Sequence, residues 1–339
     1  MNPYASIAAL AVCLGLGLGL GLGSAPSAAN AQMFKDAALE ALHVAGKSGE
    51  LQRLATQRLA AQTDDAQAVL ALAVTALAGA ETGLRQTALA RAEGCVQRLP
   101  QAAACQYALG TVLGVQAMSE GMLKAARSAG VVKTALTQAQ ALEPGWYPAR
   151  SALVEFYLVA PGMMGGSASK AAALAVSAPQ PEQVRALQAR LAMENGKPEA
   201  VLLLLTPLLS AADPEVASDA RQWATQAAFG LFSDGQAAKA QGFFERLIQD
   251  RPGHTMGPYG LARVRTEAGA FDDAVKLFDL SATLKGADRL PIDYRKGIAL
   301  QQAGRNDAAR AAYKSFVAAG NGQKSSLDDA RKRLEQLGG

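Results

Sequence analysis

Three segments carry one pattern: DGQAAKAQGFF (residues 234–244), AGAFDDAVKLF (268–278) and AGRNDAARAAY (303–313). Each has a glycine at its second position, an alanine five residues later and an aromatic residue four residues after that. The glycines are 34 and 35 residues apart along the chain. A period of this length with a glycine in the turn indicates helix-turn-helix units, each stacked on the next.

Small residues and a proline complete the pattern. Seven residues before each turn glycine stands a small residue that lets two helix backbones approach closely, namely Ala228, Ala262 or Gly297. Pro252 ends a helix where the next unit begins. Together these features resemble the tetratricopeptide repeat family, over 214–319 most clearly and more weakly upstream. The resemblance implies an all-α, right-handed superhelical solenoid of antiparallel helix pairs.

Composition agrees with a helical array. Half of the 339 residues are apolar but only 5% are aromatic, and alanine and leucine dominate the apolar share. The net charge of +4 is spread along the chain without a basic stripe, so we expect no nucleic-acid partner. Glycines, prolines and short polar turns divide the chain into about eight helix pairs plus a C-terminal capping helix. The predicted helices are 34–46, 49–62, 65–79, 84–98, 101–117, 128–143, 147–158, 167–178, 180–194, 197–210, 214–233, 236–250, 255–268, 271–285, 289–303, 306–319 and 325–337.

Residues 1–31 are predicted to be a cleaved secretory signal peptide. An apolar stretch over 5–23 is followed by Ala29-Asn30-Ala31, the small-x-small pattern of a cleavage site. An uncleaved membrane anchor is the alternative, because the stretch approaches the length that spans a bilayer. The mature chain, 32–339, is then one repeat domain outside the cytoplasm, and we expect it in the periplasm of a Gram-negative bacterium.

Export makes Cys95 and Cys105 a candidate disulfide. Each lies five residues from Pro100, which separates two predicted helices. Antiparallel helices joined by a short turn would bring such symmetric positions to the distance that a disulfide requires. Two free, buried cysteines are the alternative.

The array contains two irregular segments. About ten extra residues within 116–127 indicate an extended hairpin inside one repeat. Between Tyr157 and Lys170, a longer loop replaces the usual short turn. Its two methionines stand between Pro161-Gly162 and Gly165-Gly166. Its pattern departs from a phosphate-binding loop, because Met164 stands where the first glycine belongs. We expect a shaped loop, a serine cap on the next helix, and methionines that contact a neighbouring repeat or a partner. The loop residues are Pro161, Gly162, Met163, Met164, Gly165 and Gly166.

The resemblance also implies a ligand-binding groove, because the first helices of tetratricopeptide units line a concave surface. Transferred residue by residue, the groove positions form an aromatic floor with a few polar groups, suited to an extended peptide or an amphipathic helix. Packing between helices is the alternative role of the aromatic residues. The predicted groove residues are Phe232, Tyr259, Arg263, Glu267, Tyr294, Gln301 and Gln302, with Phe229 beside them.

No catalytic or metal-binding motif is present in the sequence. His43 and His254 stand far apart and lack metal-ligand spacing, so we expect no metal and no cofactor. The predicted function is a non-enzymatic scaffold that binds a protein of the cell envelope. A small-molecule binder attached to a transport system is one alternative, which requires an enclosed apolar pocket near 157–170. A cell-wall enzyme is another, which requires an acid such as Glu155 or Glu194 buried in the groove with a raised pKa.

Overall fold

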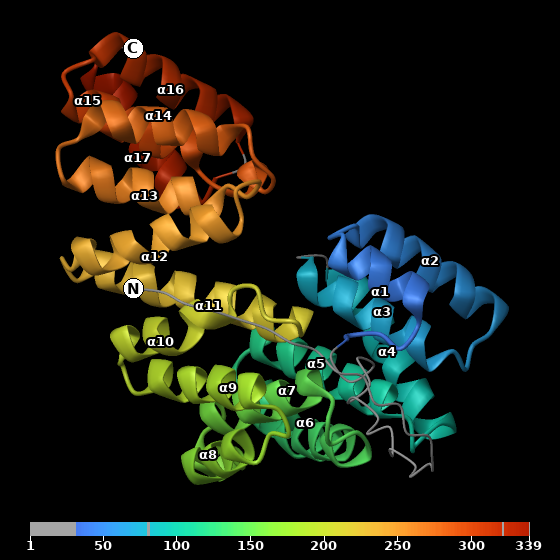
Figure 1. Ribbon diagram of the computed structural model, residues 1–339. Helices are drawn as coiled ribbons and strands as arrows, with labels where there is room; N and C mark the ends of the chain where they lie inside the picture. The colour runs from blue at the N-terminus through green and yellow to red at the C-terminus, as the bar shows by residue number, and fades with distance from the viewer. Residues whose placement is uncertain (1–31, 80–81, 321, 339) are drawn as a thin grey trace, which may run out of the picture.

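The protein is an all-α helical solenoid. The structure is a computed structural model that describes residues 32–79, 82–320 and 322–338, and within them it has helices and no strands. Eight antiparallel pairs, α1 with α2 through α15 with α16, are followed by the single helix α17, as predicted (Figure 1). The predicted signal peptide lies outside the described residues. The helices are α1 (Ala37–Val44), α2 (Ser48–Ala61), α3 (Ala66–Ala78), α4 (Thr82–Arg98), α5 (Ala103–Ser119), α6 (Met122–Leu142), α7 (Tyr147–Val159), α8 (Ala168–Val176), α9 (Pro181–Glu194), α10 (Pro198–Leu205), α11 (Pro214–Ser233), α12 (Ala237–Asp250), α13 (Met256–Glu267), α14 (Phe271–Ala282), α15 (Ile292–Gln302), α16 (Asn306–Ala319) and α17 (Lys324–Gln336).

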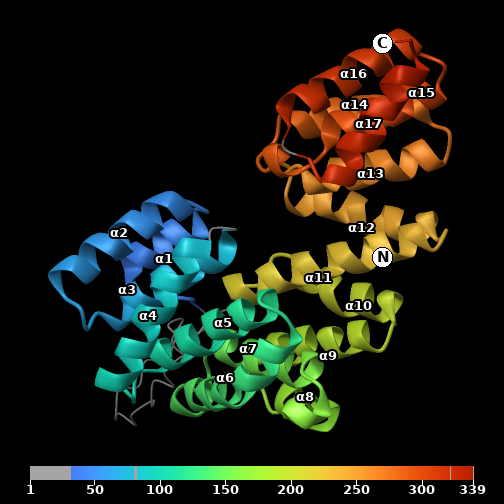
Figure 2. The same ribbon diagram turned by 180° about the vertical axis from the view of Figure 1, so that it is seen from behind.

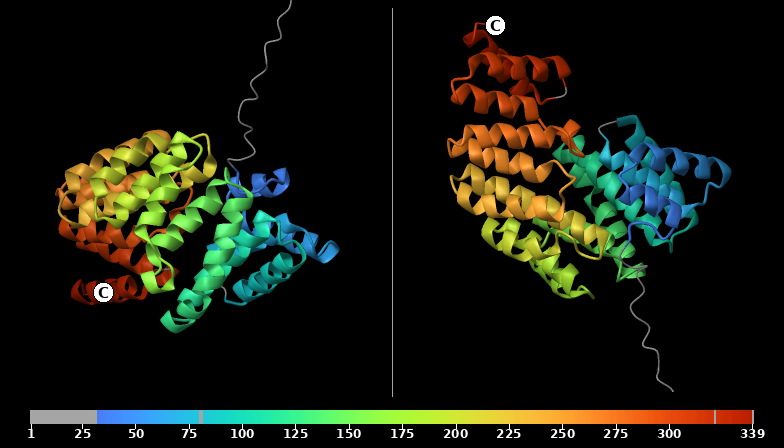
Figure 3. Two further views of the ribbon diagram at one scale, coloured as in Figure 1. Left: turned by 90° about the horizontal axis from the view of Figure 1, so that it is seen from below. Right: turned by 45° about the horizontal axis from the view of Figure 1, so that its top comes forward.

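The repeat pattern acts as predicted. Gly235, Gly269 and Gly304 turn the chain within their units with φ of 76°, 74° and 74°, a left-handed conformation that favours glycine. The pattern alanines and aromatic residues are fully buried between helices. The ring of Phe244 on α12 covers Gly260 on α13, where a Cβ atom would overlap it, so the aromatic residue of one unit fills the interface with the next. Figure 3 shows the resulting layers from α11 to α17.

Some helix boundaries differ from the prediction because of local chemistry. α10 ends at Leu205, five residues early, and the chain continues as the 3-10 helix η3 (Thr206–Leu208), because Pro207 supplies no N–H for the α-helical ladder. α15 begins at Ile292, three residues late, directly after Pro291. A short 3-10 turn, η4 (Ala287–Arg289), occupies the predicted start of that helix.

The extended hairpin is formed by two long helices and a tight turn. α5 continues to Ser119 and α6 begins at Met122, six residues before the predicted start at 128. Only Glu120 and Gly121 connect them, and Gly121 has a φ of 102° that suits glycine. The extra residues therefore lengthen the two helices.

The solenoid curls until its first helix meets its second half. His43 in the last turn of α1 and Glu215 at the start of α11 are joined by a 2.9 Å hydrogen bond. Farther along, Lys285 Nζ donates to the carbonyl oxygen of Ala45 at 3.3 Å. Figures 1 and 2 show α1 to α4 beside the column of later helices. This curvature encloses one side of α5, α7, α9 and α11.

The predicted disulfide is present. Cys95 on α4 and Cys105 on α5 are bonded, with their Cα atoms 5.5 Å apart, and both side chains are fully buried. The bond ties two successive helix pairs together near the beginning of the array. Among the described helices, none has the length and apolar character needed to span a bilayer.

Candidate functional site

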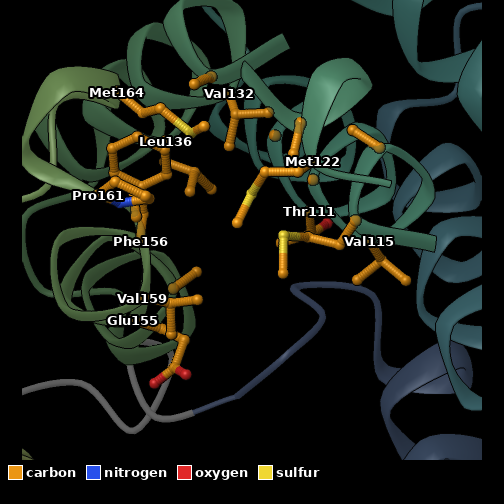
Figure 4. Close-up of a pocket in the computed structure, with 18 of the residues that line it drawn as sticks. Thr111, Val115, Met122, Val132, Leu136, Glu155, Phe156, Val159, Pro161 and Met164 are labelled. Atoms are coloured by element: carbon orange, nitrogen blue, oxygen red, sulfur yellow. The ribbon is translucent and has the colours of Figure 1, made fainter. Parts of the chain in front are cut away.

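An apolar groove of about 440 Å³ lies between α5, α6, α7 and the loop that follows α7 (Figure 4). The irregular hairpin and the irregular loop, which the sequence marks separately, thus form two walls of one groove. Apart from Thr111 and Glu155, its walls are built from apolar side chains and glycines. The groove is lined by Leu77, Gly110, Thr111, Gly114, Val115, Ala117, Met118, Met122, Ala125, Ala129, Val132, Leu136, Ala152, Glu155, Phe156, Val159, Ala160, Pro161 and Met164.

Methionines supply much of its exposed apolar surface. Met118 and Met122, on either side of the hairpin turn, are 58% and 66% exposed. Met164 approaches from the loop on another side of the groove. Met163 is 94% exposed and is absent from the groove lining. Unbranched, polarizable side chains of this kind adapt to different apolar surfaces, which suits a binding site more than a fixed core.

The loop that carries Met164 is fixed by its own backbone. Gly162–Met164 form one turn of 3-10 helix, and Gly165 follows with a φ of 99°. The Ser167 N–H donates to the carbonyl oxygen of Tyr157 at 2.8 Å, which returns the chain to the end of α7. Ser167 also caps α8, accepting from the Lys170 N–H at 3.3 Å. The expected serine cap is therefore confirmed, and the loop has a defined shape.

A second cavity, of about 480 Å³, adjoins the groove along α7. It shares Ala152 and Glu155 with the groove, so the two are neighbours. We call it the acidic pocket, because Glu155, Glu215 and Asp219 line it with one cation, Arg190. Its other walls include Met33, Tyr107, Tyr147, Pro148, Ser151, Met193, Gln222, Trp223 and Gln226. Apart from Met33, these residues come from α5, α7, α9 and α11, the first helices of their pairs, as expected for a concave surface.

Asp219 is the most perturbed acid in this pocket. Its Oδ2 atom accepts hydrogen bonds from the Tyr147 hydroxyl at 2.7 Å and the Ser151 hydroxyl at 3.1 Å. The net pKa of Asp219 is raised to about 7, mainly by burial, with the charges of Glu215 and Glu155 also raising it and both hydrogen bonds lowering it. Near neutral pH this carboxyl is therefore only partly ionised.

Glu155 and Glu194, the acids singled out from the sequence, flank a single arginine. Arg190 binds both carboxylate oxygens of Glu155, at 2.7 and 3.0 Å, and one oxygen of Glu194 at 3.3 Å. The guanidinium is buried, while both glutamates are about half exposed. A bidentate pair of this kind fixes the orientation of the arginine and compensates its burial.

Glu215 is paired with His43, which the curvature of the solenoid brings close to it. Its bond to His43 is partly buried on both sides. Burial lowers the pKa of His43, but the hydrogen bond and the charge of Glu215 outweigh it, so the net pKa is raised. His43 lies in the last turn of α1, and its contact with an acid 172 residues away has no signal in the sequence.

The predicted C-terminal groove residues are only partly on the surface. Tyr259 and Tyr294 are only 4% and 8% exposed. Both therefore pack between helices, which is the alternative role of the predicted aromatic residues. The Arg263 guanidinium lies over the Phe229 and Phe232 rings at 4.8 and 4.7 Å from their centroids. Glu267 and Gln302 are exposed and Gln301 is partly buried. Beside Phe232, Arg263 and Glu267 the structure has only a hollow of about 30 Å³.

Sequence reasoning missed the acidic pocket on the concave surface. Tyr107 on α5 and Tyr147 on α7 belong to repeats where the glycine period has drifted, whereas Asp219 lies on α11, inside the clear repeat region but outside the transferred groove positions. Family positions could be transferred only where the repeat register was certain, which led to the C-terminal units. Among the described residues, no three histidine, cysteine or acidic side chains are grouped as metal ligands.

Comparison with known proteins shows a similarity of fold alone. No model of a known family matches the chain, and no curated protein does. Among solved structures, a monomeric mutant of IFIT1 with Gppp-AAAA is similar over 80% of this chain and 62% of its own, at 16% identity and a TM-score of 0.51. The TPR domain of P58(IPK) aligns over 88% of this chain and 95% of its own at 14% identity, with a TM-score of only 0.30. This chain thus spans about three-fifths of IFIT1, and the likeness is one of fold.

Proposed function

We propose that this chain is a non-enzymatic scaffold of the bacterial cell envelope that holds a segment of a partner protein on its concave face. The apolar groove between α5, α6 and α7 is the observation that carries the proposal. It exposes methionine and valine side chains to water, and this exposure does not stabilise the free monomer. Covering them with apolar side chains of a partner would stabilise the complex by about 25 cal/mol for each Å² removed from water, before the costs of association.

The predicted C-terminal groove is part of the same proposal. Phe232 lies on α11, which also lines the acidic pocket, and Arg263, Glu267 and Gln302 lie on the next two first helices, α13 and α15. A partner segment long enough to pass the acidic pocket would meet them next. The largely buried Tyr259 and Tyr294 would then pack beneath this surface, and Gln301 would lie at its edge.

Export to the periplasm is part of the same proposal. A signal peptide over 1–31 would deliver the chain to an oxidising compartment, where the Cys95–Cys105 disulfide persists. Edman sequencing of the purified protein tests this directly. Cleavage gives an N-terminus at Gln32, whereas an uncleaved anchor gives an N-terminus at or near Met1.

A polyanionic ligand suits this concave face poorly. IFIT1, the solved structure of similar fold, was determined with Gppp-AAAA. In this chain the cavity at the centre of the array presents Glu155, Glu215 and Asp219, and its one arginine already binds two glutamates. Phosphates placed there would meet like charge in a partly desolvated site. We therefore propose no nucleic-acid partner.

A small apolar ligand is the second candidate, favoured by the position of the groove beside the 161–166 loop. Its volume of about 440 Å³ lies in the range of small-molecule sites. An enzymatic role is less well supported, despite the raised pKa of Asp219. Both other carboxylates of the pocket have a cationic partner, Arg190 or His43, so Asp219 lacks a second free carboxylate for general acid and base chemistry.

Site-specific photo-cross-linking in cells tests the proposal. A photoreactive phenylalanine analogue would replace Val159 in the apolar groove, Gln302 in the C-terminal groove, or Leu203, which is exposed on α10 away from both. The proposal predicts a discrete protein adduct from Val159 and none from Leu203. An adduct from Gln302 as well would extend the surface. Equal labelling at Val159 and Leu203 would refute a groove-bound partner.

A further inference from the structure

The two adjoining cavities have opposite chemistry, and this specifies what kind of segment fits both. The apolar groove has one charged group, Glu155, and Figure 4 shows it at the end opposite Met164. Glu155 also belongs to the acidic pocket, so the surface changes from apolar to acidic at this residue. Resting on the function proposed above, we infer that the occupant is an amphipathic segment with an apolar face for the groove and a lysine or arginine for the acidic pocket.

Charge complementarity carries the basic end of this inference. Arg190 is the only cation lining the acidic pocket and is bound to Glu155 and Glu194. Glu215 is bound to His43, and Asp219 is held by two neutral hydroxyls. Counting these partners, the pocket retains an excess of negative charge. A guanidinium or ammonium entering it would gain carboxylate partners, while a carboxylate would be repelled.

The walls of the pocket suit the same group. Tyr107 and Trp223 present aromatic side chains, and Met33 and Met193 add apolar contact. Aromatic faces attract cations and also pack against the methylene stem of a long basic side chain. Gln222 and Gln226, one turn apart on α11, offer amide oxygens as further acceptors. A fatty acid would match the apolar groove but would place its carboxylate at the acidic end.

The inference predicts that binding of the basic segment depends on pH, because it is linked to the protonation of Asp219. A bound cation stabilises the ionised form of Asp219 and so lowers a pKa that stands at about 7 in the free protein. Binding therefore strengthens as pH rises from 6 to 8. The groups that face Asp219 are Tyr147, Ser151 and Glu155 on α7, Arg190 on α9, Tyr107 on α5 and Glu215 on α11 with its partner His43. Of these, His43 also has a raised pKa, and its loss of positive charge on deprotonation would act in the same direction, so a variant must separate the two.

Calorimetric titration with synthetic helical peptides tests the inference. Three peptides of about 14 residues, long enough to extend roughly 21 Å as a helix, share one apolar face. Within a set, the three peptides differ only in two residues at one end, which are arginine, glutamine or glutamate. One set carries these two residues at the N-terminus, and a second set carries them at the C-terminus. Mature protein is expected to bind the arginine peptide about tenfold more tightly than the glutamine peptide, and the glutamate peptide least.

Two variants assign the preference to the acidic pocket. Asp219→Asn should abolish most of the strengthening between pH 6 and 8, and Asp219→Asn with Glu215→Gln should make the three peptides nearly equal. Glu199→Gln on α10, which removes an exposed charge elsewhere, should change nothing, and circular dichroism checks that each variant is folded.

The outcomes separate this inference from the function on which it rests. Equal binding of the three peptides by mature protein would overturn the basic preference and leave the groove as a docking site. Tightest binding of the glutamate peptide would overturn it more strongly. If none of the peptides binds, docking of a helical segment fails as well, and binding of the apolar dye N-phenyl-1-naphthylamine would then favour the small-molecule function.

Discussion

The Tyr147 hydroxyl on α7 donates a 2.7 Å hydrogen bond to the Asp219 carboxylate on α11, across 72 residues of chain. Neither helix is the sequence neighbour of the other, so the bond links two repeats across the acidic pocket. Burial also raises the pKa of Tyr147 well above its ordinary value, so the hydroxyl remains a donor at physiological pH. The titrating partner is Asp219, which gives the pocket a pH dependence that can be measured.

Replacing Asp219 with asparagine should remove a defined part of the pH dependence of stability. In the unfolded chain an aspartate has a pKa near 3.9, while in the folded protein the pKa of Asp219 is raised to about 7. The folded state therefore binds more protons between these values, and the free energy of unfolding falls as pH rises through that window. The wild type should lose stability relative to Asp219→Asn between pH 5 and 8, and the difference should level off above pH 8.

Urea denaturation of both proteins at several pH values measures this difference. Asp213, whose pKa burial raises to about 6, titrates in both proteins and therefore cancels, as does Glu40, whose pKa burial also raises. A difference that stays flat from pH 5 to 8 would show that Asp219 is ionised normally in the fold.

Removing the disulfide should destabilise the first half of the array. Cys95 and Cys105 close a loop of ten residues, and constraining so short a loop in the unfolded chain stabilises the fold by about 3 kcal/mol in the chain-entropy model. Replacing both cysteines with alanine, which suits their buried positions, should lower the free energy of unfolding by about that amount. Thiol titration of unfolded, unreduced wild-type protein provides the check, because two free sulfhydryls would mean that the bond does not form.

Overpacking the repeat interface should also be costly. Ala274 is fully buried on α14 at the position where the pattern requires a small residue. Ala274→Leu should lower the free energy of unfolding by about 1 to 3 kcal/mol, because the added atoms have no space between the packed helices. Ala238→Leu, at an exposed position of α12, is the matched control and should have little effect. Similar losses from both variants would mean that the repeat interface is not closely packed.

Much of the fold could be predicted from the sequence, because it depends on contacts between residues that are close along the chain. The turn glycines, the pattern alanines and aromatic residues such as Phe244 act within one repeat or between neighbours, so their spacing predicts the three units of 214–319. Glycines, prolines and short polar turns predict the remaining helix pairs and the final helix. The Cys95–Cys105 bond was predictable for the same reason, since a short turn brings the two positions together. Helix ends at Pro207 and Pro291 also follow from the residues themselves, although the prediction placed them several residues away.

The site depends on contacts that spacing does not encode. Asp219 meets Tyr147, and Glu215 meets His43, only because the solenoid curls through several repeats. That curvature sums small rotations between units, which no single motif specifies. The hairpin and the 161–166 loop were each recognised as irregular, but their common groove appears only when α5, α6 and α7 are packed. The predicted groove role of Phe232, Arg263 and Glu267 stays a prediction.

Quantitative affinity capture from an envelope extract tests the central claim, that the apolar groove holds a partner protein. The baits are the mature protein, a groove variant with Val115→Glu and Val159→Glu, and a control with Val44→Glu and Leu203→Glu, which adds the same charge at exposed apolar positions outside the groove. Circular dichroism first confirms that all three are folded. We predict one protein that the wild type and the control enrich equally and that the groove variant loses. Retention of that protein by the groove variant, or no enrichment by the wild type, would contradict the claim.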